Sequence, residues 1–367
     1  MYKRQQHLLP RSQLTDEVQV TRDIVALHAT NATAPYLSLW ARVPGFQPGM
    51  LADALYEQRS LARVLCMRTT LHVVPGDEVP IFLRAYGDQM DRSVPAEHQV
   101  DLLLVRAGLC QEEEAEALQE KLQSQVLEVL VEAGPSTVRE ISQSVPVLKA
   151  KVQHSVGKPY EGEFSVGSRL IPSMCVQGLL IRARPRGSWR SNLYEYAALS
   201  DWLPDADLEP GAPEDVRTWL VRRYLAAFGP ATFEDIRWWT GFSKGMTEDA
   251  LLPLTRELVE VAIEGLGEGY LMMTEDAQRL DGDAAPDSPY VSFLPALDPC
   301  IMGYRDRRRF LAPEHNAKVF DRAGNAMPSV WVNGQVVGAW GQRKNGEVVH
   351  GLFEEVNQEE LTLLKAD

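Results

Sequence analysis

The sequence has few cysteines and no long apolar run. Its four cysteines are far apart and include no CxxC pair, so we expect neither a disulfide framework nor a zinc ribbon; they are Cys66, Cys110, Cys175 and Cys300. No stretch of eighteen apolar residues occurs, which predicts no membrane span. The opening MYKRQQHLLPRSQ has no apolar signal-peptide core. These absences predict a cytoplasmic protein without a metal site.

The common catalytic signatures are missing as well. There is no P-loop, no GxGxxG, no GxSxG elbow and no HExxH. The sequence therefore gives no sign of nucleotide-dependent, α/β-hydrolase or zinc-peptidase chemistry, and we expect no cofactor.

The composition is that of a folded protein. The chain has 367 residues, of which 45% are hydrophobic and 24% charged. Disorder is not expected at this balance, and the length favours two to four modules.

The net charge of −14 is unevenly distributed. Taken as a whole it argues against nucleic acid as a partner. However, residues 201–289 carry 7 basic and 19 acidic side chains, whereas residues 149–190 carry eight basic ones against Glu161 and Glu163 alone. A polyanion can therefore meet a positive surface on this acidic chain.

An internal repeat organises the middle of the chain. Residues 134–141 read GPSTVREI and residues 229–236 read GPATFEDI, each after an amphipathic helical stretch. In each copy a hydroxyl residue, Ser136 or Thr232, stands where it can cap a new helix. Both copies continue into a further helix and two short strands. This order is typical of a winged helix; chance similarity of two helical hairpins is the alternative.

The N-terminal block has the same outline. A helix is expected over Thr15–Ala29, a second from Pro35 and a third from Pro48. Residues 61–75 then alternate like strands. One face of that alternation carries Cys66, Arg68, Thr70 and His72.

These patterns predict an α+β protein made of three tandem winged helices and a β-rich C-terminal region. The expected boundaries are 1–110, 111–203, 210–280 and 288–367. In the last region Asn333–Gly334 and Asn345–Gly346 are typical of type I′ hairpin turns, and a short helix over EELTLLKAD closes the chain.

Two basic segments are candidates for phosphate contact. The second winged helix carries arginines at a period of two, with a further arginine beside Trp189, and a loop of the C-terminal region is also basic. These residues are Arg182, Arg184, Arg186, Arg190, Arg305, Arg307, Arg308 and Arg309. A solvated hairpin is the alternative for the wing. The wing of the third winged helix is acidic, which favours a scaffolding role.

Two of the seven histidines lie in otherwise apolar elements. His28 is expected at the end of the first helix, beside Thr30 and Asn31, and His72 on the polar strand face. By composition alone, each is interpreted as a buried histidine with satisfied hydrogen bonds.

Several segments together resemble a known family. They are IVALHATNATAPYLSLWARV, CMRTTLHVVP, GPSTVREI, LLIRARP, GPATFEDI and FLPALDPCIMGYRDRR. They are similar to the bacterial "winged helix DNA-binding domain-containing" family, which includes the AlkZ and AlkX DNA glycosylases that excise bulky alkylated bases and interstrand crosslinks. The resemblance implies three tandem winged helices and a β-rich part that form a concave DNA-binding channel.

The resemblance also implies where catalysis takes place. Family members carry a Gln–apolar–Gln motif that positions the hydrolytic water, and the matching residues here are His28, Ala29 and Thr30. It implies that His28 orients or activates water and that Thr30 assists. The residues expected to border the lesion are Asn31, Arg68, Thr70 and His72.

The function expected from this resemblance is a monofunctional DNA glycosylase. It would hydrolyse the N-glycosidic bond of bulky or cationic N-alkylated purines in double-stranded DNA, for base excision repair or genotoxin resistance. We expect a monomer in the cytoplasm, associated with the nucleoid. The alternatives are a non-catalytic winged-helix DNA-binding protein or transcription regulator, and a protein-interaction scaffold.

Overall fold

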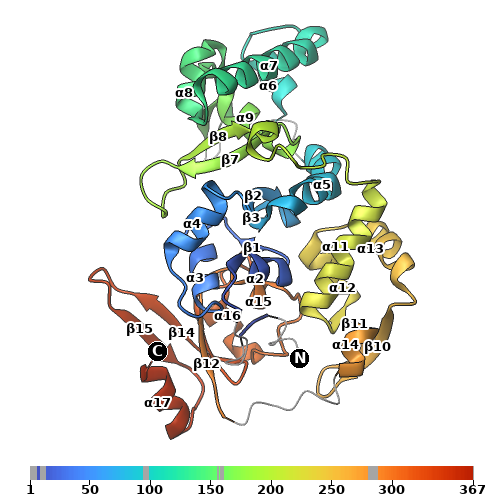
Figure 1. The fold of residues 1–367 in the computed structure, drawn as a ribbon, viewed down its shortest axis with the longest axis vertical. Helices are drawn as coiled ribbons and strands as arrows, with labels where there is room; N and C mark the ends of the chain where they lie inside the picture. The colour runs from blue at the N-terminus through green and yellow to red at the C-terminus, as the bar shows by residue number, and fades with distance from the viewer. Residues whose placement is uncertain are drawn as a thin grey trace. The chain divides into compact units, whose positions relative to one another are not determined.

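The computed structural model describes residues 6–8, 14–93, 99–154, 157, 161–279 and 288–366 as a mixture of helices and strands (Figure 1). This mixture confirms the α+β prediction. The chain divides into two compact units. The first unit comprises Met1–Leu51, Thr70–Pro75 and Gly211–Asp367, and the second comprises Ala52–Thr69 and Gly76–Pro210.

The described part of the first unit includes a short helix followed by a short strand near its N-terminal end. Helix α2 (Glu17–Asp23) is capped by the Asp16 side chain, which accepts hydrogen bonds from two backbone N–H groups of the first turn. The chain then leaves the helix at Val25, whose φ is +70°, and forms strand β1 (Leu27–His28). The predicted helix over Thr15–Ala29 is therefore wrong from Ile24 onward. A β-branched residue in the left-handed region cannot continue a helix, and strand pairing takes over.

Strand β1 pairs antiparallel with β3 (Thr70–Pro75), so that His28 lies opposite His72. Two predicted helices follow β1 as expected, α3 (Ala34–Trp40) and α4 (Pro48–Tyr56). The uninterrupted alternation predicted over 61–75 is wrong. Strand β2 (Leu61–Cys66) ends before a turn in which Arg68 and Thr69 both have positive φ, so only Thr70 and His72 share a strand.

The GPATFEDI copy also belongs to the first unit. Its short strand pairs with the second strand of its hairpin. The elements are α11 (Pro213–Phe228), β9 (Ala231–Thr232), α12 (Phe233–Thr240), α13 (Lys244–Leu251), β10 (Leu258–Ile263), β11 (Gly267–Met273) and α14 (Thr274–Arg279). Thr232 caps α12 as predicted, in a reciprocal capping box with Asp235.

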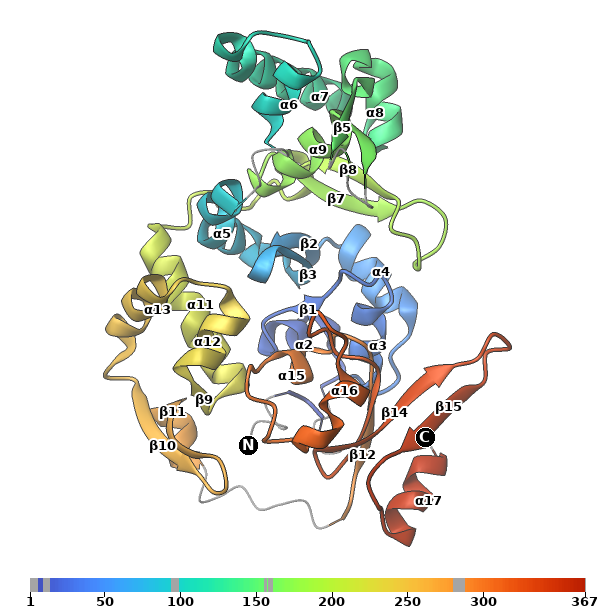
Figure 2. The same ribbon diagram turned by 180° about the vertical axis from the view of Figure 1, so that it is seen from behind.

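The C-terminal part of the first unit is an antiparallel sheet in the order β12-β13-β14-β15 (Figure 2). Its elements are β12 (Val291–Leu294), α15 (Pro299–Met302), α16 (Asn316–Val319), β13 (Ser329–Val332), β14 (Gln335–Gln342), β15 (Val348–Leu352) and α17 (Gln358–Ala366). Helix α17 packs against β12, and Leu364 joins a small core with Val330, Val332 and Val337.

The two predicted hairpin turns have different outcomes. Asn333 and Gly334 both take positive φ, of 50° and 76°, as a type I′ turn requires. At Asn345–Gly346 only Gly346 does, with φ +92°, and its N–H donates to the Arg343 carbonyl. The type I′ prediction is wrong there because the turn is one residue longer.

The second unit contains the GPSTVREI copy. Its four-stranded sheet runs in the order β2-β7-β8-β4. The elements are α5 (Val79–Ser93), α6 (Val100–Arg106), α7 (Ala115–Ala133), β4 (Ser136–Thr137), α8 (Val138–Ser144), β5 (Lys151–His154), β6 (Gly162–Ser165), α9 (Gly167–Val176), β7 (Leu180–Pro185), β8 (Tyr194–Ala198) and α10 (Leu199–Trp202).

The helix cap in this copy is one residue later than predicted. Thr137, not Ser136, caps α8, and Glu140 completes the capping box. The Ser136 hydroxyl donates instead to the Gly134 carbonyl. The hydroxyl must follow the last extended residue to reach the N3 amide, and Thr137 is the one at the position of Thr232 in the other copy.

The two copies share the order of their elements and their strand pairing. In each, a long helix is followed by a two-residue strand, a capped helix, another helix and a hairpin, and the two-residue strand pairs with the last hairpin strand. The first copy has an added hairpin, β5–β6, between its second and third helices.

Two further findings concern the described residues. No helix among them combines the length and apolar character needed to cross a bilayer. Within the same ranges, no three His, Cys, Asp or Glu side chains gather in a way that could hold a metal ion.

Candidate active site and DNA-contact residues

A histidine pair occupies the β1–β3 ladder of the first unit. His28 and His72 are cross-strand partners, and their ring centroids are 4.8 Å apart with the planes tilted by 55°. Both are buried, with 6% and 7% of their surface exposed. Directly opposed residues share one face of a strand pair. The two imidazoles therefore form a single group at the position where the sequence placed only separate histidines.

Hydrogen bonds distinguish the two rings. The Thr30 backbone N–H donates to Nδ1 of His28 at 3.4 Å. Nδ1 of His72 lies 3.1 Å from the Thr70 carbonyl, which can only accept, so this nitrogen carries the proton. His28 thus accepts through Nδ1, whereas His72 donates through Nδ1.

The predicted neighbours of His28 lie at the surface. Thr30 and Asn31 are exposed, and the Asn31 side chain accepts from the backbone N–H and hydroxyl of Thr33 at 3.0 and 2.9 Å. Thr70 is half-buried. The structure thus brings together two hydrogen-bonded pairs within the first unit, Thr30 with His28 and Thr70 with His72, which meet through the contact between the two imidazole rings.

Arg68 belongs to the second unit and lies two residues before Thr70 along the chain. It is half-buried in a left-handed conformation, with φ +54°. Desolvation lowers the pKa of its guanidinium, while nearby Tyr86 acts in the opposite direction.

The wing arginines have protein partners. Arg184 is ion-paired with Glu57 at 2.5 Å, and Arg186 contacts both Glu140, at 3.0 Å, and Glu195, at 2.5 Å. Arg190 lies 5.1 Å from the ring of Trp189. The period of two holds within β7, where Arg182 and Arg184 alternate with buried Ala183 and Pro185.

The basic loop of the C-terminal region, residues 305–309, contains two groups of arginines. Arg307 and Arg309 pack on aromatic rings, 3.4 Å from Phe320 and 3.8 Å from Tyr304, and donate to backbone carbonyls. Arg305 and Arg308 are exposed, although Arg305 pairs with Glu234 and Arg308 with Asp306.

Asp235 anchors this loop. Its carboxylate accepts from the Arg305 and Asp306 backbone N–H groups at 2.8 and 3.0 Å while it also completes the α12 capping box. Sequence reasoning missed this buried residue. The capping pattern in GPATFEDI was its signal, but the second set of partners lies about seventy residues away.

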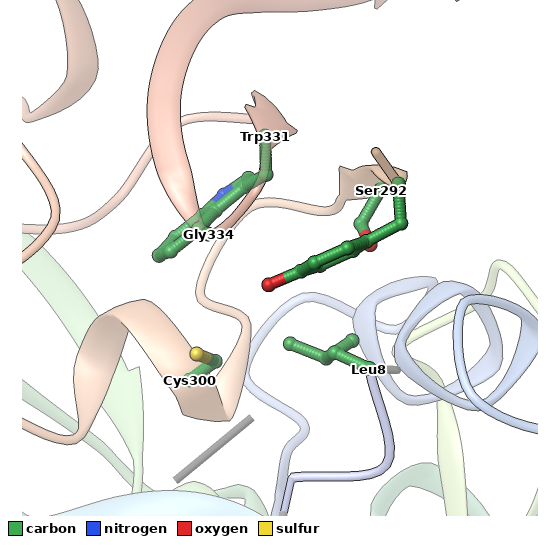
Figure 3. Close-up of a pocket in the computed structure, with 6 residues that line it drawn as sticks. Leu8, Ser292, Cys300, Trp331 and Gly334 are labelled. Atoms are coloured by element: carbon green, nitrogen blue, oxygen red, sulfur yellow. The ribbon is translucent and has the colours of Figure 1, made fainter. Parts of the chain in front are cut away.

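A small cavity adjoins the C-terminal sheet. It lies between Tyr290, Cys300 and Trp331 (Figure 3). Its volume is about 10 Å³, which is at the lower limit for one water molecule and far too small for a nucleobase.

The comparisons with known proteins place the chain in a family. The profile described as "DNA glycosylase AlkZ-like" matches residues 21–361. Among solved structures, Streptomyces sahachiroi DNA glycosylase AlkZ is similar, with a TM-score of 0.76 and 21% identity over 100% of this chain and 92% of that chain. At this identity, the likeness establishes the fold alone. No curated protein matches.

The family match extends from the first helix to the last and so covers most of the chain, and it confirms the family resemblance. The protein belongs to the DNA glycosylase AlkZ-like family.

Proposed function

We propose that this protein is a monofunctional DNA glycosylase that hydrolyses the N-glycosidic bond of bulky or cationic N-alkylated purines in duplex DNA. The observation that carries the proposal is the His28–His72 pair, because it stands at the family's motif position and combines two imidazoles with opposite hydrogen-bonding roles.

The two rings complement each other toward one water molecule. Because Nδ1 of His28 accepts from Thr30, the neutral ring carries its proton on Nε2 and donates to the water oxygen. Because Nδ1 of His72 donates to the Thr70 carbonyl, its lone pair is on Nε2 and takes the water's proton. The exposed Thr30 hydroxyl assists in orienting the water.

The substrate class follows from the absence of a general acid in this proposed mechanism. A purine alkylated at N7 is cationic, so when its bond to C1′ breaks it leaves as a neutral base without a general acid. The water oxygen forms the new bond to C1′, and its proton passes to His72. Histidines that orient a water are sufficient for such a leaving group.

The remaining sequence predictions complete the proposal. The N-terminal block and the GPSTVREI copy act as winged helices on DNA, and the acidic GPATFEDI copy has a scaffolding role. Asn31, Arg68 and Thr70 border the lesion. The exposed arginines of the wing and of the basic C-terminal loop contact phosphates. The protein acts as a monomer.

An excision assay tests the proposal. Duplexes that carry N7-methylguanine or a bulky N7 adduct are incubated with the wild-type protein and with His28→Ala, and abasic sites are scored after alkali. We expect cleavage by the wild type, a large loss in His28→Ala and unchanged affinity for DNA. His350→Ala, which changes an exposed histidine of β15, is the matched control and is expected to keep full activity.

A non-catalytic DNA-binding role is the second candidate, favoured by the replacement of both family glutamines at positions 28 and 30. The same assay decides between the two. Absence of cleavage on every alkylated duplex, together with sequence-specific binding of undamaged DNA, would favour the regulator and overturn the glycosylase proposal.

A further inference from the structure

Two arginines face each other on neighbouring strands of the second unit. Arg63 in β2 is the register partner of Arg182 in β7. Directly opposed residues project from the same face of a sheet. Arg184, two residues further along β7, lies on the same side, because its guanidinium is 4.5 Å from the ring centroid of Tyr56 and that of Arg63 is 5.4 Å from it. Like charges in this arrangement repel each other. The sheet therefore gathers three guanidinium groups on one side.

Arg63 is a buried cation that pairs with no carboxylate among the described residues. Only 2% of its surface is exposed. Its guanidinium lies 5.4 Å from the ring centroid of Tyr56 and 5.3 Å from that of Tyr194, and it donates a hydrogen bond to the Tyr56 hydroxyl. Its Nε–H meets no acceptor among the described residues. Buried arginines are normally paired, so this charge calls for an anion.

Arg182, next to Arg63, also has a buried guanidinium nitrogen that lacks a hydrogen-bond acceptor among the described residues. Its Nη1 is buried and finds no acceptor in the described part of the chain, while its guanidinium lies 5.9 Å from the Tyr196 ring. Arg184 is half-exposed and pairs with Glu57. Glu57 is the one carboxylate found on these three arginines within the described ranges, which leaves an excess of positive charge on this face.

Other arginines of the same protein show the contrast. Arg42 is equally buried but forms a two-pronged pair with Asp298, and Arg186, at the end of β7, contacts two carboxylates. Neither Arg63 nor Arg182 has such a carboxylate among the described residues.

We propose that the Arg63–Arg182–Arg184 face is a phosphate-binding site, and that in the DNA complex it holds one backbone phosphate; this rests on the proposed function. Phosphate oxygens suit this set because they are charged acceptors for several guanidinium donors. Arg184 and Arg182 contact the phosphate oxygens. Arg63, the deepest, is a positioning residue that adds positive potential and fixes the Tyr56 hydroxyl.

Thermal unfolding with inorganic phosphate tests the site without any catalytic readout. Sodium chloride at matched ionic strength is the reference. We expect a saturable rise in Tm for the wild type that is lost in the double variant R182Q/R184Q. R343Q is the matched control, since Arg343 is exposed and paired with Glu347, and it should keep the response. An equal response in wild type and double variant, or none in either, overturns the proposal.

A second variant separates a binding role from a structural one. Glu57 competes with phosphate for Arg184, and its side chain is largely exposed. E57Q is therefore expected to respond at lower phosphate concentrations than the wild type. If the ion pair matters only for folding, E57Q would lower Tm and leave the phosphate response unchanged, and the proposal would fail.

Salt titration of DNA binding identifies the source of the phosphate. For an undamaged duplex, the slope of log affinity against log salt should become less steep by about 0.9 in R182Q/R184Q, as expected for one lost phosphate contact. A changed Tm response with an unchanged slope would indicate a site for free phosphate and overturn the DNA assignment. If the wild type excises no alkylated base but R182Q/R184Q still changes the slope, the glycosylase proposal alone fails and the phosphate site stands.

Discussion

Arg42 and Asp298 lie 256 residues apart in the sequence and form a fully buried two-pronged ion pair. Both N–O distances are 2.7 Å. Asp298 also accepts from the Ser38 hydroxyl and caps α15 through the Cys300 N–H. The pair thus joins α3 to the C-terminal part of the first unit, which gives a structural reason for the LDP sequence at 297–299.

Removal of one partner of this pair should be strongly destabilising. Asp298→Asn leaves the buried Arg42 charge uncompensated, which typically costs about 3–5 kcal/mol of unfolding free energy. Chemical denaturation measures the change. Arg343→Gln, in an exposed pair with Glu347, is the control and should change stability very little. A loss of less than about 1 kcal/mol in Asp298→Asn would contradict the structural role.

The two histidines of the β1–β3 ladder should act as one unit. His28→Ala and His72→Ala are each expected to lower kcat by about 10²–10⁴-fold, because each removes half of the proposed water-binding arrangement. The double variant should lose little beyond the worse single variant. Single-turnover excision at saturating enzyme measures these rates. Multiplicative losses would show that the two rings act separately.

Asp235 and Glu140 occupy the same capping position in the two repeat copies, but Asp235 accepts additional hydrogen bonds from a distant segment. Asp235 is buried and also holds the backbone of the Arg305–Asp306 segment, so Asp235→Ala should cost about 3 kcal/mol or more. Glu140→Ala should cost about 1 kcal/mol, as for an ordinary cap. Equal losses in denaturation experiments would refute the anchoring role of Asp235.

Stability should depend on pH through Glu140. Hydrogen bonds from the Thr137 backbone N–H and hydroxyl, together with Arg186, hold its pKa below the usual 4.5. A lowered folded-state pKa gives stability that is present above the unfolded pKa and is lost as pH falls through the folded one. Glu140→Gln should therefore be less stable than the wild type near neutral pH. The difference in unfolding free energy between the two should disappear in acid. A gap of constant size across an acid titration would contradict this assignment.

Cysteine labelling should distinguish one thiol from three. Cys66, Cys175 and Cys300 are buried, and burial raises the pKa of Cys175 to about 11 and that of Cys66 further. Cys110 is half-buried. An aromatic disulfide reagent at mildly alkaline pH should label one thiol per native chain, none in Cys110→Ser, and all four in denaturant. Fast labelling of a second native thiol would indicate an open core.

The local signals of the sequence were enough for much of the fold. GPSTVREI and GPATFEDI predicted the repeated order of elements, because helix capping and chain termination depend on residues within one turn of each other. The Asn333–Gly334 turn was predicted for the same reason. The His28 and His72 positions were also singled out, as polar residues in apolar elements.

Long-range pairing was outside the reach of these signals. The helix pattern over Thr15–Ala29 gave no warning that Val25 would break it, because the competing strand partner is β3, more than forty residues later. The sequence predicts phosphate contacts for the basic loop of the C-terminal region, Arg305 to Arg309. The structure keeps Arg307 and Arg309 on aromatic rings, and these contacts depend on segments that periodicity cannot bring together.

The sequence by itself determined the family, the repeat and the candidate residues, since each is written in adjacent side chains whose spacing controls local backbone structure. Only the tertiary structure decided which of those residues share hydrogen bonds and charge. It paired His28 with His72 and neutralised Arg42 with Asp298, and it placed Arg63 beside Arg182 with no carboxylate on either among the residues that the structure describes. The physical reason is that burial makes charge and hydrogen-bond partners costly to leave unmet, and burial is settled by contacts between distant segments.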